Sequence, residues 1–125
     1  MNYSYAIIIL RVVMGIIFVT HGIARLYHGS VPDFGNYLNS QGLMIGVPLA
    51  WIITVGELVS GSLLAVGIKV RYCAAFHGLI IASGLLMVHL PNGWFVVGHG
   101  SGGVEYSVLI LAVLLVLFFT ADNKR

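Results

Sequence analysis

The sequence predicts an all-α integral membrane protein, a bundle of four transmembrane helices formed by a single domain of residues 1–125. Two observations predict this class. Hydrophobic residues make up 59% of the chain and charged residues only 8%, whereas soluble domains carry about 25% charged residues. Four apolar segments are also long enough to cross a bilayer as a helix, which takes about 20 residues. The lipid bilayer is therefore the expected surrounding of the chain.

The four spans are separated by residues that begin or end helices. We expect them at about residues 5–27, 47–68, 71–90 and 104–121. Pro48 suits the first turn of the second span, Gly67 follows its last turn, and Pro91 with Gly93 ends the third span. Between the first two spans, apolar residues recur at helical spacing after Pro32. This pattern predicts a short amphipathic helix over residues 31–41 that lies at the membrane interface.

Basic residues near the ends of the spans predict the orientation. The side that holds both termini and the second connection carries four of them, whereas the other side carries only Arg25; the four are Lys69, Arg71, Lys124 and Arg125. Because cytoplasmic segments are enriched in Lys and Arg, we expect both termini in the cytoplasm. The net charge of +2, without a long basic run, gives no reason to expect a nucleic-acid partner.

Three ionisable residues, Arg11, Glu57 and His77, fall in the inner half of the predicted bundle. Arg11 lies roughly 9 Å and Glu57 roughly 15 Å from the cytoplasmic end of its span. An unpaired charge at this depth costs at least about 2.5–3.5 kcal/mol, so the two residues should form a buried ion pair. Whether this pair only clamps two helices together or also relays protons stays open.

A second set of polar residues falls near the outer face, at depths that agree within roughly one helical turn. It consists of His21, Arg25, His89 and Glu105, which come from three spans. We expect these four residues to bind a ligand. The structural alternative is a salt bridge between Arg25 and Glu105, with both histidines bonded to backbone carbonyls. No metal site is expected, although a haem or metal ion on His21 and His89 is an alternative. No catalytic residue can be assigned.

These residues recur in a set of motifs spread over nearly the whole chain. The set comprises Arg11-x3-Gly15-x2-Phe18-x2-His21-Gly22-x2-Arg25-Leu26, then Gly56-Glu57 with Gly61 and Gly67-x3-Arg71, then His89 and Gly103-Val104-Glu105-Tyr106. It resembles the DoxX family of small bacterial membrane proteins. The resemblance implies a four-helix bundle that crosses the bacterial inner membrane several times. It also implies a redox setting, because relatives include a subunit of a thiosulfate:quinone oxidoreductase.

The outer polar residues are compatible with a quinone, because histidine both donates and shuttles protons. No cysteine cluster or flavin-binding glycine motif carries electrons, so a partner redox protein would have to supply them. The expected function is therefore a membrane subunit of a quinone-linked redox complex rather than a complete enzyme. The alternatives are a non-catalytic scaffold, a small proton or solute permeation unit, and a haem- or metal-binding membrane protein. Association with further copies of the chain stays open.

Overall fold

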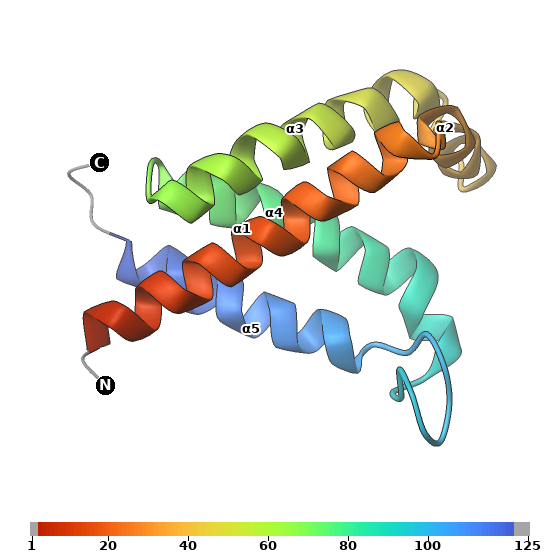
Figure 1. Cartoon of the computed structure of the whole chain (residues 1–125). Coiled ribbons are helices and arrows are strands. Elements are labelled where there is room, and N and C mark those ends of the chain that lie inside the picture. The colour runs from red at the N-terminus through yellow and green to blue at the C-terminus, as the bar shows by residue number, and fades with distance from the viewer. Residues whose placement is uncertain (1–2, 122–125) are drawn as a thin grey trace. The chain divides into compact units, whose positions relative to one another are not determined.

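Every regular element of the protein is a helix in the computed structural model, which describes residues 3–121. The first half contains α1 (Tyr3–Tyr27), α2 (Val31–Ser40) and α3 (Gly46–Val66) (Figure 1). In the second half α4 (Val70–Gly84) continues through a π-helical turn, η1 (Leu85–His89), and a 3₁₀ turn, η2 (Leu90–Asn92), and a long connection leads to α5 (Glu105–Thr120). The predicted all-α class is confirmed, and α2 lies where a short helix was expected.

Three helical segments are long and apolar enough to cross a membrane, namely α1, α3 and the continuous segment Val70–Asn92. Apolar side chains on their surfaces, such as those of Ile9 and Ile16, are more than half exposed, as suits contact with lipid. The helix α5 is also apolar but has 16 residues, about 24 Å of length, against a hydrocarbon core of about 30 Å. That α5 crosses the bilayer stays a prediction.

The predicted orientation, with both termini in the cytoplasm, also stays a prediction. Half of the basic bias came from Lys124 and Arg125, which lie outside the described residues. Both other basic residues of that side, Lys69 and Arg71, lie at the beginning of α4, next to the tight turn that follows α3.

The chain forms two compact units, Met1–Ile68 and Lys69–Arg125, which we call the N-terminal unit and the C-terminal unit. In the N-terminal unit α1 packs along α3. A Cβ atom added to Gly15 would stand 2.6 Å from the carbonyl oxygen of Gly61, and one added to Gly22 would stand 2.8 Å from the side chain of Leu58. These pairings show that the two helices are antiparallel, and that glycine permits their close approach.

The short helix α2 packs against the N-terminal end of α3. Val31 and Leu38 of α2 are buried, and Gly35 lies so close to Val47 that an added Cβ would clash with its backbone. The side-chain oxygen of Asn39 accepts a hydrogen bond of 2.8 Å from the backbone N–H of Gly46, where α3 begins. This helix is therefore fixed to the end of α3 that lies next to the last turns of α1.

In the C-terminal unit α4 packs against α5. Buried residues from both helices form its core, including Cys73, Ala74, Ile110 and Leu114. Arg71, at the start of α4, donates from Nε to the carbonyl oxygen of Phe118 at the end of α5, at 3.3 Å. The two helices are therefore antiparallel, and the connection between them closes the opposite end of the unit.

Candidate functional site

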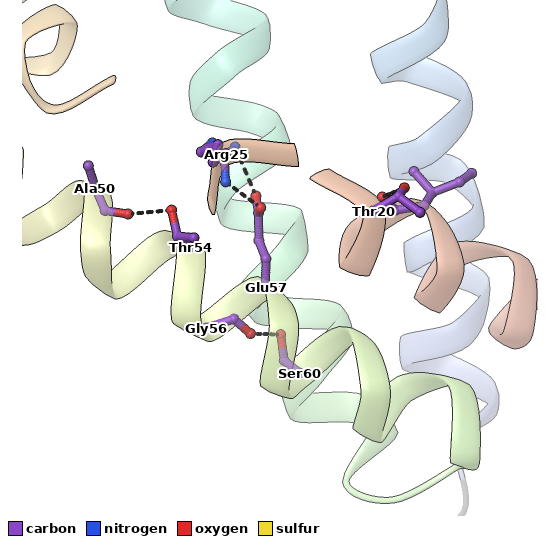
Figure 2. A network of polar contacts seen from close by, with 8 residues as sticks. Thr20, Arg25, Ala50, Thr54, Gly56, Glu57 and Ser60 are labelled. Carbon is purple, nitrogen blue, oxygen red and sulfur yellow. Dashed lines mark hydrogen bonds and ion pairs between the residues drawn. The ribbon is translucent and has the colours of Figure 1, made fainter. Parts of the chain in front are cut away.

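An ion pair between α1 and α3 is the most deeply buried charged group of the described residues. The Nη1 atom of Arg25 donates to Oε2 of Glu57 at 2.6 Å, and Nη2 lies 3.5 Å from Oε1 (Figure 2). The side chain of Glu57 is only 5% exposed and that of Arg25 is 20% exposed. The guanidinium and carboxylate thus meet with two contacts, the geometry that gives Arg–carboxylate pairs their directionality.

A close approach of α1 and α3, one turn away from Arg25, positions this ion pair. Gly22 lies one turn before Arg25, where an added Cβ would stand 2.8 Å from the side chain of Leu58 and 3.3 Å from the carbonyl oxygen of Thr54. On α3, Glu57 shares the buried face with Thr54, whose hydroxyl donates to the carbonyl of Ala50 at 2.8 Å within the same helix (Figure 2). The neighbouring hydroxyl is thereby satisfied by its own helix.

An aromatic ring from α2 completes the surroundings of Arg25. The guanidinium carbon lies 4.7 Å from the centre of the Phe34 ring, within the range of a cation–π interaction. Phe34 fits the helical spacing that predicted α2, but nothing in the sequence indicated that its ring would lie at Arg25.

The expected pair between Arg11 and Glu57 is wrong, because the partner of Glu57 is Arg25. Arg11 instead donates from Nε to the carbonyl oxygen of Ala65 at 3.3 Å, and its guanidinium lies against Gly67. The reason is the antiparallel register. It sets Arg11 level with the last turn of α3, eight residues beyond Glu57, a rise of about 12 Å. That Arg11 and Glu57 relay protons stays a prediction.

The two outer polar residues of the C-terminal unit both bond to the connection between α4 and α5. His89 Nδ1 lies 2.7 Å from the carbonyl oxygen of Gly102, and Oε1 of Glu105 accepts a hydrogen bond of 2.9 Å from the backbone N–H of Val96. Both residues therefore fix the loop of residues 93–104. Neither hydrogen bond could be derived from the sequence, because both depend on how the glycine-rich loop turns.

The four residues predicted to bind a ligand are divided between the units. His21 is exposed and lies one turn before Arg25 on α1, whereas His89 and Glu105 belong to the C-terminal unit. The carboxylate that pairs with Arg25 is that of Glu57, not the alternative partner Glu105. That the four line a common site stays a prediction.

No group of three or more His, Cys, Asp and Glu side chains among the described residues could hold a metal ion.

Comparison with known sequences settles the family. The sequence profile of the DoxX family matches residues 6–90 of the chain, which is well over half of its length. The chain belongs to the DoxX family. It is also 28% identical over 123 residues to "Putative oxidoreductase CatD" of Bacillus subtilis (strain 168), an alignment that covers 94% of this chain and 83% of that protein. No solved structure matches the chain.

The DoxX match begins in α1 and ends at the first residue of η2. It therefore contains the Arg25–Glu57 pair and His89, but it ends before Glu105. The family match thus covers residues 6–68 of the N-terminal unit and extends through α4 and its π-helical end.

Proposed function

We propose that this DoxX protein is a multi-pass membrane subunit of a quinone-linked redox complex in the inner membrane of a bacterium, and that its outer polar residues bind the quinone. The ion pair of Arg25 and Glu57 is the observation that carries the proposal. It is buried in helices that are otherwise almost wholly apolar. The name of the relative, "Putative oxidoreductase CatD", supports the redox setting.

Stability alone gives a poor reason for such a pair. Removing two charges from water costs several kcal/mol per ion, and replacing a buried ion pair by apolar residues is often neutral or stabilising. Ionisable residues within apolar spans are accordingly functional by default, as parts of substrate or proton pathways. The pair therefore points to a ligand or a proton near the end of α1.

The chemistry of Arg25 and His21 fits a quinone ring. A guanidinium carries five N–H donors, and Glu57 engages the Nη1 and Nη2 atoms, so donors remain for a carbonyl oxygen. His21, one turn earlier and exposed, can donate to a ligand or exchange protons with it. Glu57 holds the guanidinium in position, and electrons would come from a partner redox protein.

The test is the thermal stability of the purified protein with a short-chain quinone analogue. We expect the quinone to raise the melting temperature, because a ligand that binds only the folded protein stabilises it. His21→Phe should reduce the rise, whereas His28→Phe, which changes an exposed histidine just after α1, should leave it unchanged. No rise at any soluble quinone concentration would refute the proposal.

A structural role is the second candidate, and the contact with Phe34 favours it. Through Arg25, that contact links α2 to the ion pair of α1 and α3, so the three residues could serve only to clamp three helices of a scaffold. If so, variants of Arg25 would lower stability while quinones produced no shift in the parent protein. Purification from native membranes with a bound redox protein would support the redox complex over an isolated scaffold.

A further inference from the structure

The orientation of the His89 ring is set by a backbone carbonyl. His89 Nδ1 lies 2.7 Å from the carbonyl oxygen of Gly102, which is hydrogen-bonding distance. A carbonyl oxygen can only accept, so Nδ1 must carry the hydrogen. In the neutral ring, Nε2 then has no hydrogen and presents a lone pair. The contact thus makes the second ring nitrogen of His89, Nε2, an acceptor.

The accepting carbonyl is held by a closed loop. The backbone N–H groups of Gly102 and Gly103 donate to the carbonyls of Val96 and Phe95, at 3.3 and 3.0 Å. The N–H groups of the next two residues bond back to residues 93 and 94, both at 3.0 Å. Gly102 has a φ of +67°, which a side chain would disfavour, and Asn92 Nδ2 also approaches its oxygen, at 3.4 Å. The carbonyl therefore has one orientation.

His89 also stands in an unusual backbone segment. It is the last residue of the π-helical turn η1, and π-helical turns within α-helices occur frequently at functional sites. Apolar side chains in the residues that follow His89 are exposed, including Leu90, Trp94 and Val97. A half-buried histidine with an acceptor nitrogen, in a part of the chain with exposed apolar side chains, suits an apolar ligand that carries a hydroxyl group.

We propose that His89 binds the reduced, dihydroxy form of the quinone in preference to the oxidised form, through a quinol hydroxyl that donates to Nε2. The inference rests on the proposed function and specifies which form of the ligand this chain selects. A quinol offers O–H donors, whereas an oxidised quinone offers only carbonyl acceptors, which would face the lone pair of Nε2 without a hydrogen between them. One hydrogen bond of ordinary net strength corresponds to a preference of about threefold to tenfold.

The test compares the affinities of a short-chain quinol and its quinone, both measured anaerobically. His89→Asn is the informative variant, because the amide nitrogen of Asn can still donate to Gly102, whereas its shorter side chain places no acceptor at the position of Nε2. His99→Asn is the matched control, since His99 lies in the same loop and packs edge-on against Phe95. A Trp51→Phe background makes Trp94 the only tryptophan, and its fluorescence reports the loop.

We expect the parent protein and His99→Asn to prefer the quinol, and His89→Asn to bind both forms equally with unchanged Trp94 fluorescence. Equal affinities in the parent, or an unchanged preference in His89→Asn, would overturn the inference and leave the proposed function standing. If neither form binds, the proposed function fails and the inference with it. ¹⁵N NMR of histidine-labelled parent protein needs no substitution, and a hydrogen on Nε2 of the neutral ring would also overturn the inference.

Discussion

Replacing Arg25 and Glu57 singly and together should show whether Glu57 pairs with Arg25, as in the structure, or with Arg11, as expected from the sequence. Arg25→Met leaves a carboxylate of 5% exposure without its cation, and breaking a buried pair in this way costs about 3–5 kcal/mol. Glu57→Gln keeps the shape and one acceptor, so the lost charged hydrogen bond should cost about 1.5–3 kcal/mol. The double variant removes both charges and should be less harmful than the sum, by about 2 kcal/mol.

The assay is equilibrium unfolding of the purified protein in mixed detergent micelles, with the free energy of unfolding measured for each member of the cycle. The control cycle combines Arg11→Met with Glu57→Gln. Because Arg11 bonds to the carbonyl of Ala65, this second cycle should be additive within about 0.3–0.5 kcal/mol. Additivity of Arg25 with Glu57, together with coupling of Arg11 to Glu57, would refute the assignment of partners made here.

Three further substitutions or fusions test other parts of the structure. Gly15→Ala should destabilise the protein by about 1–3 kcal/mol, because its Cβ would stand 2.6 Å from the backbone oxygen of Gly61. Gly78→Ala is the control and should be neutral or slightly stabilising, because a Cβ at Gly78 meets open space. Equal effects of the two substitutions would contradict the close approach of α1 and α3. Phe34→Leu should cost about 1 kcal/mol of stability through loss of the cation–π contact, and should cost nothing in an Arg25→Met background. Reporter fusions should behave as cytoplasmic after the last residue and as external within residues 93–104, and the reverse pattern would contradict the predicted orientation.

Composition and helix-ending residues were sufficient to predict the fold class and the helix positions. Length and hydropathy act locally, so the apolar segments, Pro48, Gly67 and Pro91 marked the ends of helices to within a few residues. The connection between the last two helices was harder. The π-helical and 3₁₀ turns that end α4 are five and three residues long, which is too short for a periodic signal in the sequence.

The candidate site was predicted in its residues but not in its pairing. Cost arguments for buried charge correctly identified Glu57 as a residue in need of a cation. The choice between Arg11 and Arg25 depends on the register of two antiparallel helices, which close glycine contacts determine. Depth estimated from each span alone carries no information on that register. The length of the arginine side chain adds to the uncertainty in the partner, since a guanidinium reaches over more than one helical turn.

In both units, an arginine of the first long helix donates a hydrogen bond to a backbone carbonyl near the end of the second long helix. The last carbonyls of a helix lack partners within the helix and carry a partial negative charge, and hydrocarbon offers no water to bond them. In α3 the N–H groups of residues 67 and 68 bond to the carbonyls of Leu63 and Leu64, and Arg11 of the preceding long helix donates to that of Ala65. In α5 the carbonyl of Phe118 accepts from Arg71, whose guanidinium also lies 5.4 Å from the centre of the Phe118 ring.

An arginine in an apolar helix therefore does not by itself indicate a functional site in this protein. Arg11 and Arg71 have a structural partner in a helix-terminal carbonyl, which explains their presence without any ligand. Arg25 differs, because its partner is a buried carboxylate that itself needs an explanation. His89 differs too, because bonding Nδ1 to a carbonyl leaves Nε2 available as an acceptor. The two candidates for function, Arg25 and His89, thus lie at the end of each unit opposite to Arg11 and Arg71.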